Sequence, residues 1–173
     1  MFHREHVFRP RPICSSVARL VVKENIMNKR ETVQALMDAV QKGDFESAKT
    51  MLADDFQFSG PVPEPISSEA WLGMSENLKA AFPDLDYNFK IESVDGDTVN
   101  IAAELKGTHK RDLDLTSMNM GVIPATNKSF EAAHEHGVAT LRDGRISAWA
   151  MDGTEGAGLL AILDQLGVKP ASM

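Results

Sequence analysis

Two short dipeptides constrain the fold of this chain more than any other feature. Asp95-Gly96 and Asp143-Gly144 each separate two stretches in which apolar residues alternate with polar ones. Alternation with a period of two is typical of a strand with one covered face, and Asp-Gly between two such stretches favours a tight hairpin turn. The second half of the chain is therefore predicted to form antiparallel hairpins, with strands near residues 87–91, 99–105, 128–141 and 145–151.

The first half of the chain has helical patterns. Asn28 and Glu31 have the spacing of a capping box and predict a helix that begins there and ends at Gly43. Ser67 or Ser68 opens another helix, which Pro83 stops. A short helix after Asp44, a short strand at Asp54–Phe58 and a closing helix over Leu159–Leu166 complete the expected elements. Helices followed by meandering strands predict an α+β fold, and such long strands must bend into a strongly curved sheet that encloses one pocket.

Residues 1–26 differ from the rest of the chain. They contain five basic residues and two prolines, without the long apolar core of a secretory signal. Met27, followed by Asn-Lys-Arg-Glu, looks like a natural start. We therefore expect residues 1–26 to be a poorly ordered, dispensable extension, and residues 27–170 to form one domain.

Charge and composition argue against several function classes. The net charge is −7, and the basic residues of the first segment leave a still more acidic body, so a nucleic acid or an anionic membrane is not expected as a partner. Cys14 is the only cysteine, which excludes an internal disulfide and fits a reducing, cytoplasmic compartment. The sequence contains no phosphate-binding or dinucleotide-binding glycine motif and no nucleophile elbow, so nucleotide binding is not expected.

Five short motifs together resemble a known family. They are Ala81–Leu85 (A-F-P-D-L), Gly107–His109 (G-T-H), Gly121–Thr126 (G-V-I-P-A-T), Leu141–Ile146 (L-R-D-G-R-I), and Gly158–Leu160 followed by Gln165–Gly167. In this order and spacing, the chain resembles the SnoaL-like polyketide cyclases, also called ester cyclases, of the nuclear-transport-factor-two-like superfamily. The resemblance covers about residues 28–168. It implies a cone-shaped, cystatin-like α+β fold, no cofactor, and a homodimer formed sheet to sheet.

The same resemblance leads to two hypotheses about function. The first is a polyketide cyclase-like enzyme, in which a carboxylate moves a proton on a small, largely apolar carbonyl substrate. The second is a non-catalytic domain of the same fold that binds a small molecule or builds a dimer. A carboxylate that faces a histidine across an apolar cavity would favour the enzyme.

Asp152 and His109 are the predicted catalytic pair. Asp152 follows Trp149 at the end of the last strand, where the acid/base aspartate of the family lies. Because a short insertion follows it, Glu155 is the substitute, and ordering of the turn before the last helix is the alternative role for Asp152. His109 has the parity of the covered face if its strand continues unbroken, and the histidine of the family's G-T-H motif often lines the pocket.

The remaining candidates line the predicted pocket. His134 and His136 share one face of a continuous strand with Phe130 and Val138, a parity that looks inward. They are assigned to substrate binding, with a core or dimer-face role as the alternative. Two close histidines on one strand, with His109 as a third ligand, could hold a metal ion, but no metal is expected because the family that the chain resembles does not use one. Trp71, Tyr87 and Trp149 are the expected aromatic wall.

Overall fold

The computed structural model describes residues 15–169, which form four α-helices, one 3-10 helix and ten strands. In chain order these are α1 (Ser15–Lys42), α2 (Phe45–Thr50), β1 (Leu52–Ser59), β2 (Ile66–Ser67), α3 (Ser68–Ala81), β3 (Lys90–Asp95), β4 (Thr98–Ala103), β5 (Lys106–Thr108), β6 (Leu113–Leu115), η1 (Thr116–Met118), β7 (Gly121–Ile123), β8 (Ser129–Glu131), β9 (Glu135–Arg142), β10 (Arg145–Met151) and α4 (Gly158–Gln165). The α+β class expected from the sequence is confirmed.

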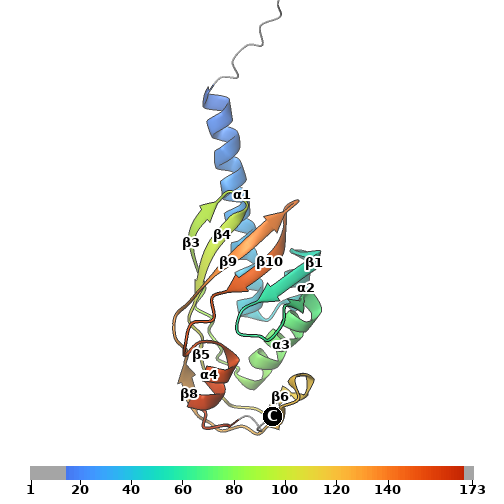
Figure 1. Cartoon of the computed structure of the whole chain (residues 1–173), viewed down its shortest axis with the longest axis vertical. Helices are drawn as coiled ribbons and strands as arrows, with labels where there is room; N and C mark the ends of the chain where they lie inside the picture. Colours follow the sequence, from blue (N-terminus) through green and yellow to red (C-terminus); the bar gives the residue numbers. More distant parts are fainter. Residues whose placement is uncertain (1–14, 170–173) are drawn as a thin grey trace, which may run out of the picture.

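A six-stranded sheet forms the body of the molecule (Figure 1), with the strand order β2-β1-β10-β9-β4-β3. The hairpins β3–β4 and β9–β10 are antiparallel and turn at the two Asp-Gly dipeptides, as predicted. In the described part of the chain, only β1 and β10 pair in parallel. Two small two-stranded sheets, β5–β8 and β6–β7, extend the fold beyond the main sheet. The mostly antiparallel pairing agrees with a sheet that curves around the helices.

The helices cover one face of the sheet. The second half of α1 buries Val33, Leu36, Met37 and Val40 completely or almost completely. Helix α3 begins after the Ser67 cap, whose side chain accepts a hydrogen bond from the Ala70 amide, and it ends just before Pro83, as predicted. Because these apolar stripes share the inner face of the sheet with β4, β9 and β10, the core lies between helices and sheet.

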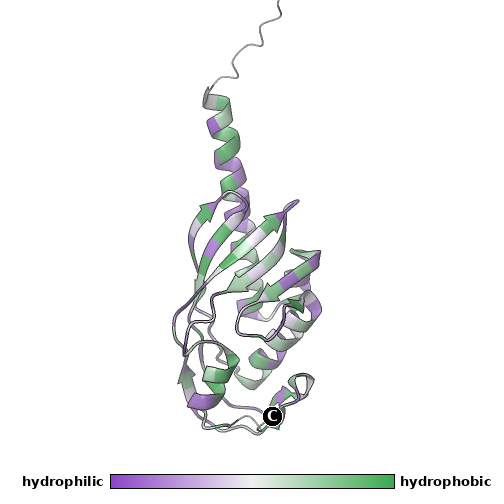
Figure 2. Ribbon diagram, viewed as in Figure 1, coloured by the Kyte–Doolittle hydropathy of each residue, from purple (hydrophilic) through white to green (hydrophobic). Residues whose placement is uncertain are grey.

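Helix α1 is longer than the sequence predicted. It begins at Ser15, so Asn28 lies inside it and caps nothing. The first part of α1 projects beyond the sheet, and Figure 2 shows hydrophobic and hydrophilic residues side by side along it. Leu20, Val21 and Val22 there are more than half exposed. Residues 1–14 of the expected extension lie outside the described range. Within residues 15–169, no helix is long and apolar enough to cross a membrane.

The predicted continuous strand from Lys128 to Leu141 is wrong. The structure divides it into β8, which pairs with β5, and β9, which pairs with β4. Between the two, the Ala132 amide donates to the Leu105 carbonyl and the Ala133 amide to the Gly156 carbonyl. The chain changes sheets at this point, so side chains before and after the break do not follow one alternation. The strand expected over residues 99–105 likewise ends at Ala103, before β5 begins.

Candidate functional site

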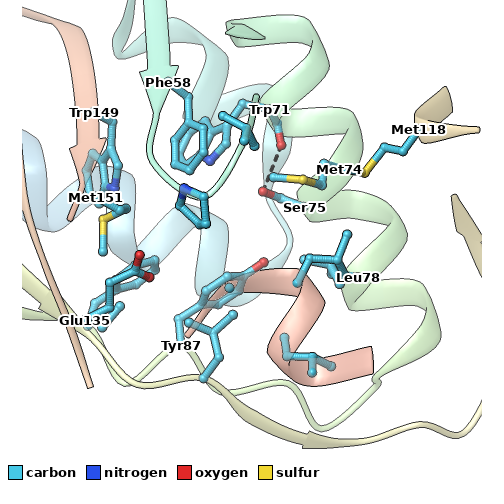
Figure 3. A pocket seen from close by; sticks show the side chains of 18 residues that line it. Phe58, Trp71, Met74, Ser75, Leu78, Tyr87, Met118, Glu135, Trp149 and Met151 are labelled. Atoms are coloured by element: carbon cyan, nitrogen blue, oxygen red, sulfur yellow. Dashed lines mark hydrogen bonds between the residues drawn. The ribbon is translucent and has the colours of Figure 1, made fainter. Parts of the chain in front are cut away.

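A partly open cavity lies between the inner face of the sheet, α3 and α4 (Figure 3), with a volume of about 100 Å³. Its wall is almost entirely apolar and is built by residues from most elements of the fold. These are Phe58, Pro61, Val62, Trp71, Met74, Ser75, Leu78, Tyr87, Phe89, Ala103, Leu105, Met118, Glu135, Trp149, Met151, Gly158, Leu159 and Ile162. A wall of this kind, with few polar groups, is typical of a site for a small molecule.

Aromatic rings form one side of the cavity. Trp71 of α3 lies between Phe58 of β1 and Trp149 of β10, with ring centroids 5.9 Å and 5.8 Å away. Tyr87 stacks on Phe89 at 4.9 Å. These offset and tilted contacts hold each ring in place by packing, so the cavity keeps its shape without a ligand. The structure thus places all three predicted wall residues, Trp71, Tyr87 and Trp149, at the cavity.

Glu135 is the carboxylate of the cavity. It is the first residue of β9 and is 5% exposed, and Figure 3 shows its oxygens directed into the space between the aromatic rings. The Gly153 amide donates to its Oε1 at 3.2 Å. Burial raises the pKa of the Glu135 carboxyl, and the nearby charge of Asp152 adds to the effect, while the bond from Gly153 opposes it. A carboxylate whose pKa is raised by burial is a stronger base than an exposed one, so it can accept a proton in a reaction and return it.

The Tyr87 hydroxyl is the second polar group of the cavity. It is buried, and among the described residues it has no hydrogen-bond partner. Burial raises the pKa of Tyr87 and the neighbouring Ser75 hydroxyl opposes this effect, so the Tyr87 hydroxyl stays protonated and remains a donor. A buried donor without a partner costs stability, typically about 1–3 kcal/mol. Such a group is therefore available to a polar atom of a bound molecule. The neighbouring Ser75 hydroxyl gives its own proton to the Trp71 carbonyl at 2.9 Å, so it is not a donor to the Tyr87 oxygen.

Asp152 and Glu155 lie outside the cavity, and both are exposed. Asp152 Oδ1 accepts hydrogen bonds from the Thr154 hydroxyl at 2.8 Å and the Thr154 amide at 3.2 Å. The Thr154 hydroxyl is the main cause of the lowered pKa of the Asp152 carboxyl, and the Thr154 amide also contributes. This arrangement orders the turn before α4, which is the alternative role that the sequence left open.

His109 is completely buried but does not line the cavity. Its ring stacks on Phe82, with centroids 5.0 Å apart, and its Nδ1 accepts a hydrogen bond from the Thr126 amide at 3.2 Å. The proton of the neutral ring is therefore on Nε2, which has no partner in the described part of the chain. Burial lowers the pKa of His109. The structure does not bring His109 and Asp152 together.

The inward orientation predicted for His134 and His136 is wrong. Both histidines are exposed, because the break before β9 reverses the expected alternation. They lie on the outer side of the sheet beside Glu92 and Glu104. Glu135, between them in the chain, takes the inward position instead.

Sequence reasoning missed Glu135, although one signal pointed to it. Counting back from Leu141 and Ala139, which are buried, the same parity reaches Glu135 rather than the histidines. Counting forward from Phe130 gives the opposite answer, because Phe130 belongs to another sheet. The conflict between the two ends of the predicted strand was the available sign of a break.

Comparison with known proteins agrees with this architecture. The sequence profile of a family described as SnoaL-like polyketide cyclase matches residues 30–152. Among curated proteins, none matches the chain.

Solved structures share the fold. IdmH from Streptomyces antibioticus, a proposed polyketide cyclase, is 26% identical with a TM-score of 0.61, and the match covers 81% of this chain and 99% of that one. A proposed SnoaL-like polyketide cyclase from a Jannaschia species is 21% identical with a TM-score of 0.63, covering 83% and 94%. An epoxide hydrolase of the LEH-like type from M. tuberculosis is 17% identical with a TM-score of 0.56, covering 83% and 95%. The last two show likeness of fold alone.

Proposed function

Because the chain belongs to the SnoaL-like polyketide cyclase family, we propose that it is a cyclase-like enzyme in which Glu135 is the acid/base group and Tyr87 binds the substrate oxygen. The substrate is a small, largely apolar carbonyl compound, as the aromatic and methionine-rich wall favours. One observation carries the proposal. Two polar groups face the same apolar cavity (Figure 3): a buried carboxyl with a raised pKa, and a hydroxyl that has no hydrogen-bond partner within residues 15–169.

The proposed reaction is an intramolecular aldol closure. The Glu135 carboxylate takes a proton from the carbon next to a carbonyl group, and the resulting electron pair forms a bond to a second carbonyl carbon of the same molecule. Glu135 then returns the proton to the oxygen of that second carbonyl, so the product is an isomer of the substrate. Tyr87 donates a hydrogen bond to the enolate oxygen while the charge develops there, in a site from which the apolar wall excludes water.

Glu135, rather than Asp152, is proposed as the acid/base group because Glu135 lies in the wall of the cavity. The Asp152 carboxylate is exposed, does not line the apolar cavity and has a lowered pKa, so it is a weaker base than Glu135. Glu135 has both the position and the raised pKa. The loop that carries Asp152 contributes in another way, since its Gly153 amide fixes one oxygen of Glu135.

The test is a screen of small apolar diketones that can close by aldol addition, with ring formation followed by NMR. We expect the Glu135→Gln variant to lose turnover by about a hundredfold or more, and Tyr87→Phe by about tenfold or more. Glu155→Gln is the matched control, because it removes an exposed carboxylate from the loop that carries Asp152 and should leave turnover unchanged.

The same variants separate the alternatives. Loss of turnover in Asp152→Asn together with normal turnover in Glu135→Gln would contradict the proposal. The almost wholly apolar wall also supports a second candidate, a domain that binds an apolar small molecule without converting it. In that case Glu135→Gln would bind the compounds that the wild type binds, and neither would convert them.

We also propose that the chain forms a homodimer, as the family resemblance implies. Sedimentation equilibrium of the full chain should then give twice the mass of one chain. A single species with the mass of one chain at tens of micromolar would contradict this assembly.

A further inference from the structure

Three side chains with metal-binding atoms gather on the outer side of the sheet, away from the cavity. They are Glu92 of β3, His134 just before β9, and His136 of β9, and one ligand atom from each lies within 4.8 Å of the others. We propose that Glu92, His134 and His136 form a binding site for a divalent transition-metal cation such as Zn²⁺. This site is separate from the cavity and does not depend on the function proposed for Glu135.

The pairing of three strands brings these residues together. His136 lies opposite Ala102 of the middle strand β4, and Ala102 lies opposite Lys90 of β3. Strands two positions apart in a sheet are about 9–10 Å apart, so side chains meet only if the residue between them is small. Ala102 has only a methyl group. The irregular register between Ile91 and Ser93 is consistent with a bulge that turns the exposed Glu92 toward this outer surface.

The distances suit a small cation bound by nitrogen and oxygen. In a tetrahedral zinc site with bonds of about 2.0–2.1 Å, ligand atoms are about 3.4 Å apart. Glu92 Oε2 and His136 Nδ1 are already 3.1 Å apart. The His134 and His136 rings are 4.9 Å apart at an interplanar angle of 76°. A rotation of the exposed His134 ring would direct one of its nitrogens to the point that the ligand atoms of Glu92 and His136 already face, giving three ligands for one cation.

A fourth group lies next to His134. Glu104 Oε2 is 3.8 Å from His134 Nδ1 and accepts a hydrogen bond from the side-chain amide (Nδ2) of Asn88 at 3.4 Å. A carboxylate beside a ligating histidine either completes the coordination or orients the ring from behind. Two imidazoles with carboxylates favour Zn²⁺ and its transition-metal neighbours over Mg²⁺ or Ca²⁺, which prefer oxygen ligands only.

The surrounding carboxylates also favour a cation. Glu92 and Glu104 lie beside the two imidazoles, and the exposed Asp152 lines the same surface hollow as Glu92 and His136. The histidines flank Glu135 in the chain. A cation on this outer side would therefore hold the start of β9, the element from which Glu135 enters the cavity.

The experiment is equilibrium dialysis of the metal-free full chain against Zn²⁺ at pH 7.5, with the metal counted per chain. We expect one Zn²⁺ per chain, and an affinity reduced by about tenfold or more in His136→Ala and in Glu92→Gln. His3 and His6 are also potential ligands, so the double variant His3→Gln/His6→Gln is the control and should bind as the wild type does. Because the substituted positions of the site are exposed, circular dichroism should show unchanged folding.

Three results would overturn the site. The first is no binding at about 100 µM Zn²⁺. The second is binding that His134→Ala and His136→Ala leave unchanged, which would show that these histidines only form ion pairs with their carboxylates. The third is loss of binding in the His3→Gln/His6→Gln control.

Discussion

Gly137 of β9 lies against β10 with no room for a side chain, and replacing it by alanine should destabilise the fold. A Cβ at this position would lie 2.5 Å from Met151 Sδ and 2.6 Å from the Ala150 carbonyl oxygen. The Met151 side chain can move. The Ala150 carbonyl cannot, because the pairs Val138–Ala150 and Gly137–Met151 belong to the ladder between the two strands. The strands would have to separate locally.

The expected magnitude follows from two opposing effects. Overfilling a packed site costs about 1–3 kcal/mol. Removing a glycine also lowers the conformational entropy of the unfolded chain, which stabilises the fold by about 0.4–1 kcal/mol. We therefore expect Gly137→Ala to lower the free energy of unfolding by about 1–2 kcal/mol. Since Met151 lines the cavity, this variant should also weaken ligand binding.

Gly73 provides a matched control with the opposite sign. It lies inside α3, and a Cβ there would meet no heavy atom within 4 Å. Alanine is favoured over glycine in a helix by about 1 kcal/mol, so Gly73→Ala should raise stability. Urea unfolding followed by tryptophan fluorescence measures both variants. The expected effect of close strand contact would be wrong if Gly137→Ala were as stable as the wild type and the slope of its free energy of unfolding against urea concentration were unchanged.

Three further predictions concern stability. Tyr87→Phe should be as stable as the wild type or more stable by about 1 kcal/mol in thermal unfolding, because it removes a buried hydroxyl that has no partner among the described residues. A variant less stable than the wild type by more than about 1 kcal/mol would contradict this, because it would show that the hydroxyl makes a hydrogen bond. Since burial lowers the pKa of His109 below its ordinary 6.5, the unfolded chain binds more protons there, and the free energy of unfolding should fall as pH drops below about 6.5. Urea midpoints at several pH values should show this fall in the wild type and a smaller one in His109→Gln, and equal falls would contradict it. A chain that starts at Met27 should keep the urea midpoint of the full chain, since residues 17–26 of α1 are exposed, and a lower midpoint would contradict this expectation.

The order of elements was predictable because local signals determine it. Ser67 as a cap, Pro83 as a stop and the two Asp-Gly turns each act on their immediate neighbours, and the structure has helix α3 and both hairpins where they were expected. The start of α1 was not predictable in this way, because the capping pattern at Asn28 is equally compatible with the interior of a longer helix.

The site was less predictable because it depends on which strands pair. The segment from residue 128 to 141 has one continuous pattern in the sequence, yet β8 pairs with β5 and β9 pairs with β4. No local period reveals a change of partner. This change turns His134 and His136 outward and Glu135 inward, so the catalytic carboxylate proposed here differs from Asp152. The aromatic wall was predictable, since large apolar residues at strand and helix spacing almost always face the core.

A pH titration of the Glu135 carboxyl by ¹³C NMR, assigned with the Glu135→Gln variant, tests its proposed role. We predict a midpoint for Glu135 above its ordinary 4.5, because the carboxyl is buried in an apolar cavity. Asp152 should titrate below its ordinary 3.8 in the same experiment, because Thr154 binds its charged form. A Glu135 midpoint at or below 4.5 would show a solvated carboxylate and would contradict the central claim that Glu135 is the acid/base group of this cavity.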